Sequence, residues 1–151
     1  MANISDAAKA EELTKRRSRA LPALAVVLLA QQVAYLSGAG AGGGDRTVDH
    51  VQAAAWLVLS MVLLLALATG GGWVYSRRVR DLANDEATRA HQADAFRVGF
   101  IVAMTAAVAL YVVTLFEPLG GRDAVHVILS LGIASALLRF GTLERRAQRD
   151  D

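Results

Sequence analysis

The sequence predicts an all-α membrane protein whose four transmembrane helices form an up-down-up-down bundle with both termini in the cytoplasm. Four long apolar segments predict the helices, and the distribution of Lys and Arg predicts the orientation. The 151 residues are 54% hydrophobic and 20% charged, whereas soluble chains carry about 25% charged residues. The chain has no cysteine, which excludes disulfides and thiolate-bound metal centres.

Each of the four apolar segments approaches the roughly 20 residues that a helix needs to cross about 30 Å of hydrocarbon. The predicted spans are 20–37, 51–75, 98–116 and 124–140. They contain no Asp, Glu or Lys, and their only arginine, Arg139, lies at the end of the fourth span. A soluble bundle would show a polar stripe on each helix. Spans with so few charged residues therefore favour a membrane protein over a water-soluble helix bundle.

The orientation follows from the Lys and Arg residues that flank the spans, because such residues accumulate in cytoplasmic loops. Fourteen of the sixteen lie in the N-terminal segment, the linker 77–97 and the C-terminal end of the chain. The other two loops contain only Arg46 and Arg122. This asymmetry predicts a multi-pass protein with its N- and C-termini in the cytoplasm.

We expect residues 1–19 to form a cytoplasmic segment, in which 5–19 form a short amphipathic helix near the membrane surface. A basic stretch before an apolar one is also typical of a secretory signal peptide. Gln31 and Gln32 would interrupt a short apolar signal region. We therefore expect an uncleaved first span.

The cytoplasmic linker 77–97 contains a helix start. Asn84 is a favourable N-cap, and Asp85 and Glu86 follow it as acids in the first turn. Arg89 is four residues after Asp85. We expect this helix to continue into the third span, and we expect these four residues to form either a solvated surface or a docking surface for a partner. At the other end of the chain, 142–151 predict a charged cytoplasmic tail.

The stretch Asn84-Asp85-Glu86 followed by the third span resembles an uncharacterised group of small bacterial four-helix inner-membrane proteins. Ala87 stands where that group carries arginine. The resemblance implies a bacterial inner membrane as the location. It also implies a membrane tether that antagonises a cytoplasmic regulator of the helix-turn-helix class.

Polar side chains inside the spans need partners, because an unsatisfied amide is costly in hydrocarbon. Gln31 and Gln32 lie in the first span. Their candidate partners are Ser60, Thr105 and Ser130. Two interpretations remain open: hydrogen bonds that hold the helices together, or a polar path that Gln31, Gln32, Ser130 and His126 would line.

Small residues recur at every fourth position in the last two spans, a spacing that lets helix backbones approach closely. They are Gly99, Ala103 and Ala107 in the third span, and Gly132 and Ala136 in the fourth. The pattern suits packing inside the bundle as well as an oligomer interface.

The outer side of the membrane offers weak candidates for a metal site, namely His50, Asp123 and His126. Their spacing matches no established ligand motif, and the alternative is one haem held between the two histidines. We therefore expect no metal and no cofactor.

The sequence favours a non-catalytic protein that acts through protein–protein interaction, because no catalytic constellation is recognisable. We expect an accessory subunit of a membrane complex or a tether for a cytoplasmic regulator, in a homo-oligomer or a larger assembly. The alternative is a small homo-oligomeric transporter or pore, although the spans lack the carboxylate that ion coupling usually needs. The net charge of +2 gives no reason to expect direct nucleic-acid binding.

Overall fold

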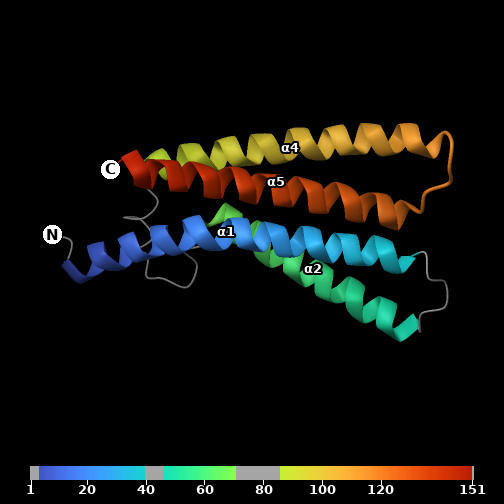
Figure 1. Ribbon diagram of the computed structural model, residues 1–151, viewed down its shortest axis with the longest axis horizontal. Helices are drawn as coiled ribbons and strands as arrows, with labels where there is room; N and C mark the ends of the chain where they lie inside the picture. The colour runs from blue at the N-terminus through green and yellow to red at the C-terminus, as the bar shows by residue number, and fades with distance from the viewer. Residues whose placement is uncertain (1–3, 40–45, 71–85, 151) are drawn as a thin grey trace.

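The computed structural model describes residues 4–39, 46–70 and 86–150, and these residues form four α-helices (Figure 1). The helices are α1 (Ile4–Ala39), α2 (Arg46–Ala68), α4 (Glu86–Thr114) and α5 (Gly121–Asp150). Each contains a stretch long and apolar enough to cross a membrane. The structure therefore confirms an all-α fold with four such helices, as expected of a multi-pass membrane protein.

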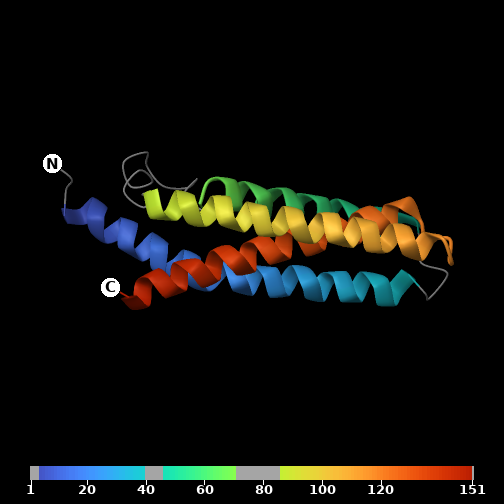
Figure 2. The same cartoon turned by 90° about the horizontal axis from the view of Figure 1, so that it is seen from above.

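The last helix, α5, is the common neighbour of the other three. It packs along α1 and α4 over much of its length and along α2 over a shorter part (Figures 1 and 2). Gln32 and Pro22 of α1 meet Ser130 and Gly141 of α5 respectively, so these two helices are antiparallel. α5 also provides much of the buried core, with Ile133, Leu137 and Phe140.

The crossing of α4 and α5 is close because small residues face one another there. A Cβ atom at Gly99 would lie 2.8 Å from the Cβ of Ala136 and 2.8 Å from the carbonyl oxygen of Gly132. A Cβ atom at Gly132 would lie 3.0 Å from the Cβ of Ala103. These four small residues therefore serve the packing of α4 against α5 within one chain.

The N-terminal segment and the first span form one continuous helix, α1, rather than a surface helix followed by a separate span. Residues 5–19, where the sequence predicts a short amphipathic helix, are the first part of this longer helix. Pro22 lies inside α1 and cannot donate a hydrogen bond to the carbonyl of Ser18. That carbonyl instead accepts a hydrogen bond of 2.9 Å from Nε of Arg145 in α5. A partner from another helix thus satisfies the group that the proline leaves free.

The proline ring also requires a small residue opposite it. A Cβ atom at Gly141 would lie 2.5 Å from Cγ of Pro22 and 2.6 Å from its Cδ. Gly141 and Arg145 are four residues apart and therefore lie on the same face of α5. One face of α5 thus accommodates both the shape of the proline and the carbonyl that it frees.

The second helix ends earlier than the sequence predicts. α2 ends at Ala68, whereas the predicted span continues to Tyr75. Gly70 adopts a positive φ of 62°, the left-handed conformation with which glycine commonly terminates helices. Residues 71–85 lie outside the described part of the chain, and so does most of the three-glycine stretch.

The outward face of α4 remains apolar and exposed along the bundle. Phe100, Met104, Val108 and Tyr111 are all exposed on it. In a chain that spans a membrane, lipid tails cover such a face.

Candidate functional site

A buried polar cluster connects three helices near the end of the bundle where α1 ends and α5 begins. It consists of Gln32 from α1, Trp56 from α2, and His126 and Ser130 from α5, all at most 5% exposed. Trp56 Nε1 donates to Ser130 Oγ at 3.2 Å, and Ser130 Oγ donates to Gln32 Oε1 at 2.8 Å. Gln32 Oε1 also lies 2.8 Å from His126 Nδ1. One amide oxygen is therefore the acceptor for two groups of α5.

The imidazole of His126 lies between two aromatic rings. Its centroid is 3.7 Å from that of Trp56 and 4.2 Å from that of Tyr35, with interplanar angles of 25° and 7°. The hydroxyl of Tyr35 donates a hydrogen bond of 2.7 Å to Asp123 Oδ1. Stacking and hydrogen bonding therefore fix the ring on both faces and at one edge.

The hydrogen-bond pattern determines the tautomer of His126. An amide oxygen only accepts, so Nδ1 must carry the hydrogen in this contact and Nε2 is left as an acceptor. Nε2 of His126 and Nε2 of Gln32 are buried and have no hydrogen-bond partner among the described residues. The cluster therefore has one acceptor and one amide donor group unused.

This arrangement is suited to holding helices together. The hydroxyl of Ser130 donates to Gln32, so the imidazole is not placed as a base for that hydroxyl. Interhelical hydrogen bonds of this kind contribute about 0.6 kcal/mol each on average. The cluster contributes stability and fixes the register of α1, α2 and α5.

The structure brings together some of the predicted polar residues and separates others. Gln32, Ser130 and His126 belong to the polar cluster, whereas Gln31 is half-buried and has no hydrogen bond to a described residue. The suggested partner Thr105 is exposed and donates to Ile101 in its own helix. Ser60 is buried, but its hydroxyl has no partner in the described ranges.

Two members of this neighbourhood were missed in the sequence, namely Trp56 and Tyr35. Trp56 lies in the first third of the second predicted span, and only its indole N–H signals that a buried tryptophan needs an acceptor. Tyr35 lies close to the end of the first span and offers a similar signal through its hydroxyl.

The weak metal candidates do not form a ligand set in the part of the chain that the structure describes. No three His, Asp or Glu side chains gather there as a metal ion would require. Asp123 accepts from Tyr35, and His126 bonds to Gln32. The side chain of His50 lies outside the described residues.

A second polar cluster lies at the opposite end of the bundle, where α1 begins and α5 ends; we call this the polar end. The side chains of Arg17 in α1 and Glu144 in α5 are at most 3% exposed, and Nη1 of Arg17 lies 3.7 Å from Oε2 of Glu144. His91 of α4 places Nδ1 3.1 Å from Glu144 Oε1. The guanidinium of Arg17 also lies 5.7 Å from the ring centroid of Phe140. One carboxylate therefore joins three helices.

Further contacts fix α4 at the polar end. Arg139 donates from Nε to Asp94 Oδ2 at 2.6 Å, and both side chains are about 40% exposed. Gln92 donates to the carbonyl of Leu67 at 2.9 Å, in the last turn of α2. This bond caps α2 with a side chain from α4.

The predicted docking residues lie only partly within the described chain. Asn84 and Asp85 lie outside it, and α4 begins at Glu86. Glu86 and Arg89 are exposed and lie on the outward face that continues to Phe100. The helix continues from there into the third span, as the sequence predicts.

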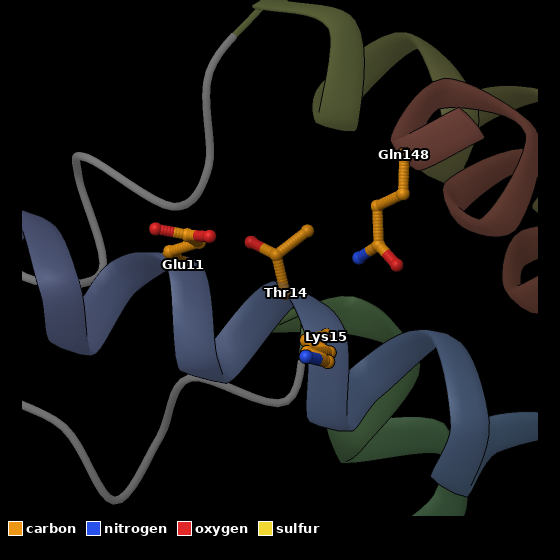
Figure 3. A pocket seen from close by; sticks show the side chains of 4 residues that line it. All are labelled: Glu11, Thr14, Lys15 and Gln148. Carbon is orange, nitrogen blue, oxygen red and sulfur yellow. The ribbon is translucent and has the colours of Figure 1, made fainter. Parts of the chain in front are cut away.

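A hollow of about 450 Å³ lies between α1 and α5 at the polar end, lined by Glu11, Thr14, Lys15 and Gln148 (Figure 3). Gln148 Oε1 lies 3.1 Å from Ser18 Oγ, which donates the bond. The lining combines one acid, one base and two neutral polar groups, which gives no clear preference for a class of ligand.

Comparisons with known proteins leave the chain without a relative on which to base its function. No protein-family model, curated protein or solved structure matches it.

Proposed function

We propose that this chain is a non-catalytic integral membrane protein that acts through protein–protein contacts at its polar end. The polar end would face the cytoplasm of a bacterium, with both termini there and the helices crossing the inner membrane in alternating directions. The concentration of Lys and Arg in the segments at this end supports that orientation. The resemblance of residues 84–86 to small bacterial inner-membrane proteins supports the choice of membrane.

One observation carries the proposal: the polar end is a built structure rather than a set of loose charged flanks. Solvated flanking segments do not need a buried ion pair, yet Arg17 and Glu144 are both buried and His91 joins them from a third helix. Burying such a pair has a large desolvation cost and brings geometric specificity. Holding three helix ends in one arrangement is what a recognition surface requires.

Among the described residues of this end, exposed bases outnumber exposed acids, which suits a partner with an acidic surface. The exposed acids are Glu11, Glu12 and Glu86. The exposed bases are Lys9, Lys15, Arg16, Arg19, Arg89, Arg97, Arg145, Arg146 and Arg149. An accessory role in a membrane complex and the tethering of a cytoplasmic regulator, such as a helix-turn-helix protein, both use such a surface.

The buried polar cluster favours this function over a transporter or pore. Gln32, Ser130 and His126 bond to one another, and aromatic rings cover both faces of the imidazole. Gln31, which a polar path would also need, does not join them. Groups that satisfy one another between packed helices are poorly placed to line a path for a solute.

A pull-down of the tagged full-length protein in mild detergent, followed by mass spectrometry, tests the proposal. The test variant replaces Asp85, Glu86 and Arg89 by Ala. The matched control replaces Glu117 and Arg122 by Ala, which removes one acid and one base from exposed positions at the opposite end of the bundle. A stoichiometric partner that the control retains and the test variant loses is the expected result. A homo-oligomer without any partner in all samples would refute the proposal and favour the transporter alternative.

A further inference from the structure

A second hollow, which we call the basic hollow, lies on α1 just before its apolar stretch begins. It has a volume of about 450 Å³ and is lined by Glu12, Lys15, Arg16, Arg19 and Ala20. The three cations are exposed, and none has a carboxylate of a described residue within 4.0 Å. The hollow therefore gathers three bases against one acid without internal neutralisation.

The basic hollow faces away from the bundle. Its residues follow helical spacing along one side of α1, whereas the buried residues Leu13, Arg17 and Leu21 follow the opposite side. The outward side continues along the span with Val26 and Val27, which are 60% and 54% exposed. An uninterrupted strip thus runs from the basic hollow onto an apolar surface.

The strip is long enough to cover one leaflet of a bilayer. From Arg19 to Val33, which is 64% exposed on the same side, the helix rises about 21 Å at 1.5 Å per residue. Half of a hydrocarbon core of about 30 Å is roughly 15 Å. A molecule with an anionic group at the basic hollow and alkyl chains along the valines would therefore lie in one leaflet.

We propose that the basic hollow binds the phosphate headgroup of an anionic phospholipid whose acyl chains lie along the outward valine face of α1. Lys15, Arg16 and Arg19 supply the positive charge, against the single carboxylate of Glu12. The apolar continuation selects a lipid over a free phosphate ion, because a free ion gains nothing from it. The site lies on α1, whereas Glu86 and Arg89, which the pull-down tests, lie on α4, so different variants test the two proposals.

Native mass spectrometry of the detergent-purified full-length protein tests the site, with phosphatidylglycerol and phosphatidylcholine of identical acyl chains as probes. We expect the wild type to bind phosphatidylglycerol more tightly by at least about tenfold. Each basic residue near anionic lipid contributes on the order of fivefold in affinity. Replacing Lys15, Arg16 and Arg19 by Gln should therefore weaken phosphatidylglycerol binding by up to about a hundredfold and leave phosphatidylcholine binding unchanged.

The matched control replaces Arg89, Arg146 and Arg149 by Gln, which removes the same charge from exposed positions at the polar end. This control should retain the preference for phosphatidylglycerol over phosphatidylcholine. An equal loss of phosphatidylglycerol affinity in both variants would refute a defined site. Absence of any preference in the wild type would also refute it. Displacement of the lipid by equimolar inorganic phosphate would overturn the choice of a lipid ligand. Circular dichroism checks that the variants keep their helices. Arg19→Gln alone provides a milder test, with an expected loss of about fivefold in affinity for phosphatidylglycerol.

Discussion

Replacing Gly99 by Ala should weaken the packing of α4 on α5. The new Cβ would lie 2.8 Å from two atoms of α5, one of them the carbonyl oxygen of Gly132, so the helices must move apart. Overpacking of this kind costs about 1–3 kcal/mol. Alanine gains about 1 kcal/mol over glycine within a helix. We therefore expect a net loss of up to about 2 kcal/mol in the free energy of unfolding.

The assay is reversible unfolding in mixed micelles with increasing SDS, followed by circular dichroism. Gly121→Ala is the matched control, because the same Cβ at that helical position would have no neighbour within 4 Å. The control should be as stable as the wild type or slightly more stable. Because Gly121 is the first residue of α5, its substitution gains less helix propensity than a substitution within a helix. The difference between the two variants is therefore a lower bound on the cost of the close approach.

A double-mutant cycle with Ala136→Gly sharpens the test. Removing the Cβ of Ala136 eliminates one of the two contacts at 2.8 Å and leaves the contact with the oxygen of Gly132. We expect a favourable coupling of about 0.5 kcal/mol or more, as for residues in direct contact. If Gly99→Ala is as stable as Gly121→Ala, or if the cycle shows no coupling, the reasoning about this crossing is wrong.

Two further predictions concern the polar contacts. Ser130→Ala leaves the indole N–H of Trp56 without its acceptor, and we expect the free energy of unfolding in SDS to fall by about 0.6–1.7 kcal/mol. The control Ser135→Ala should cause no change, because that hydroxyl bonds only within its own helix. Glu144→Gln removes the charge that faces the buried Arg17 and should destabilise by several kcal/mol, whereas Asp94→Asn in an exposed pair should cost at most about 1 kcal/mol. Equal effects of these two substitutions in thermal unfolding would contradict the assigned difference in burial.

The sequence predicted the four apolar helices well, because length and the absence of charge are sufficient signals for a membrane span. It predicted the end of α2 less well, since Gly70 and the residues after it continue the apolar run to Tyr75 and the helix nevertheless ends at Ala68. The continuity of α1 could not be predicted from Pro22, because its acceptance depends on Arg145, which is far away in the sequence.

The polar contacts, too, could be predicted from the sequence only in part. Ser130 was among the candidate partners of Gln32 because few hydroxyls lie within the spans. Arg17 was counted among the basic residues that flank the spans, and Glu144 was not singled out, since nothing local distinguishes a buried charge from its solvated neighbours. Burial of a charge is decided by the helices that pack around it, and a single sequence does not contain that arrangement.

The central position of α5 has a consequence for the biosynthesis of this protein. Of the four helices, α5 is the last to leave the ribosome, yet α1, α2 and α4 all pack on it and make few contacts with one another among the described residues. Gln32 and Trp56 therefore enter the membrane before Ser130 and His126, their partners, have been synthesised. The earlier helices must wait as separate spans, and the bundle closes only when α5 inserts between them.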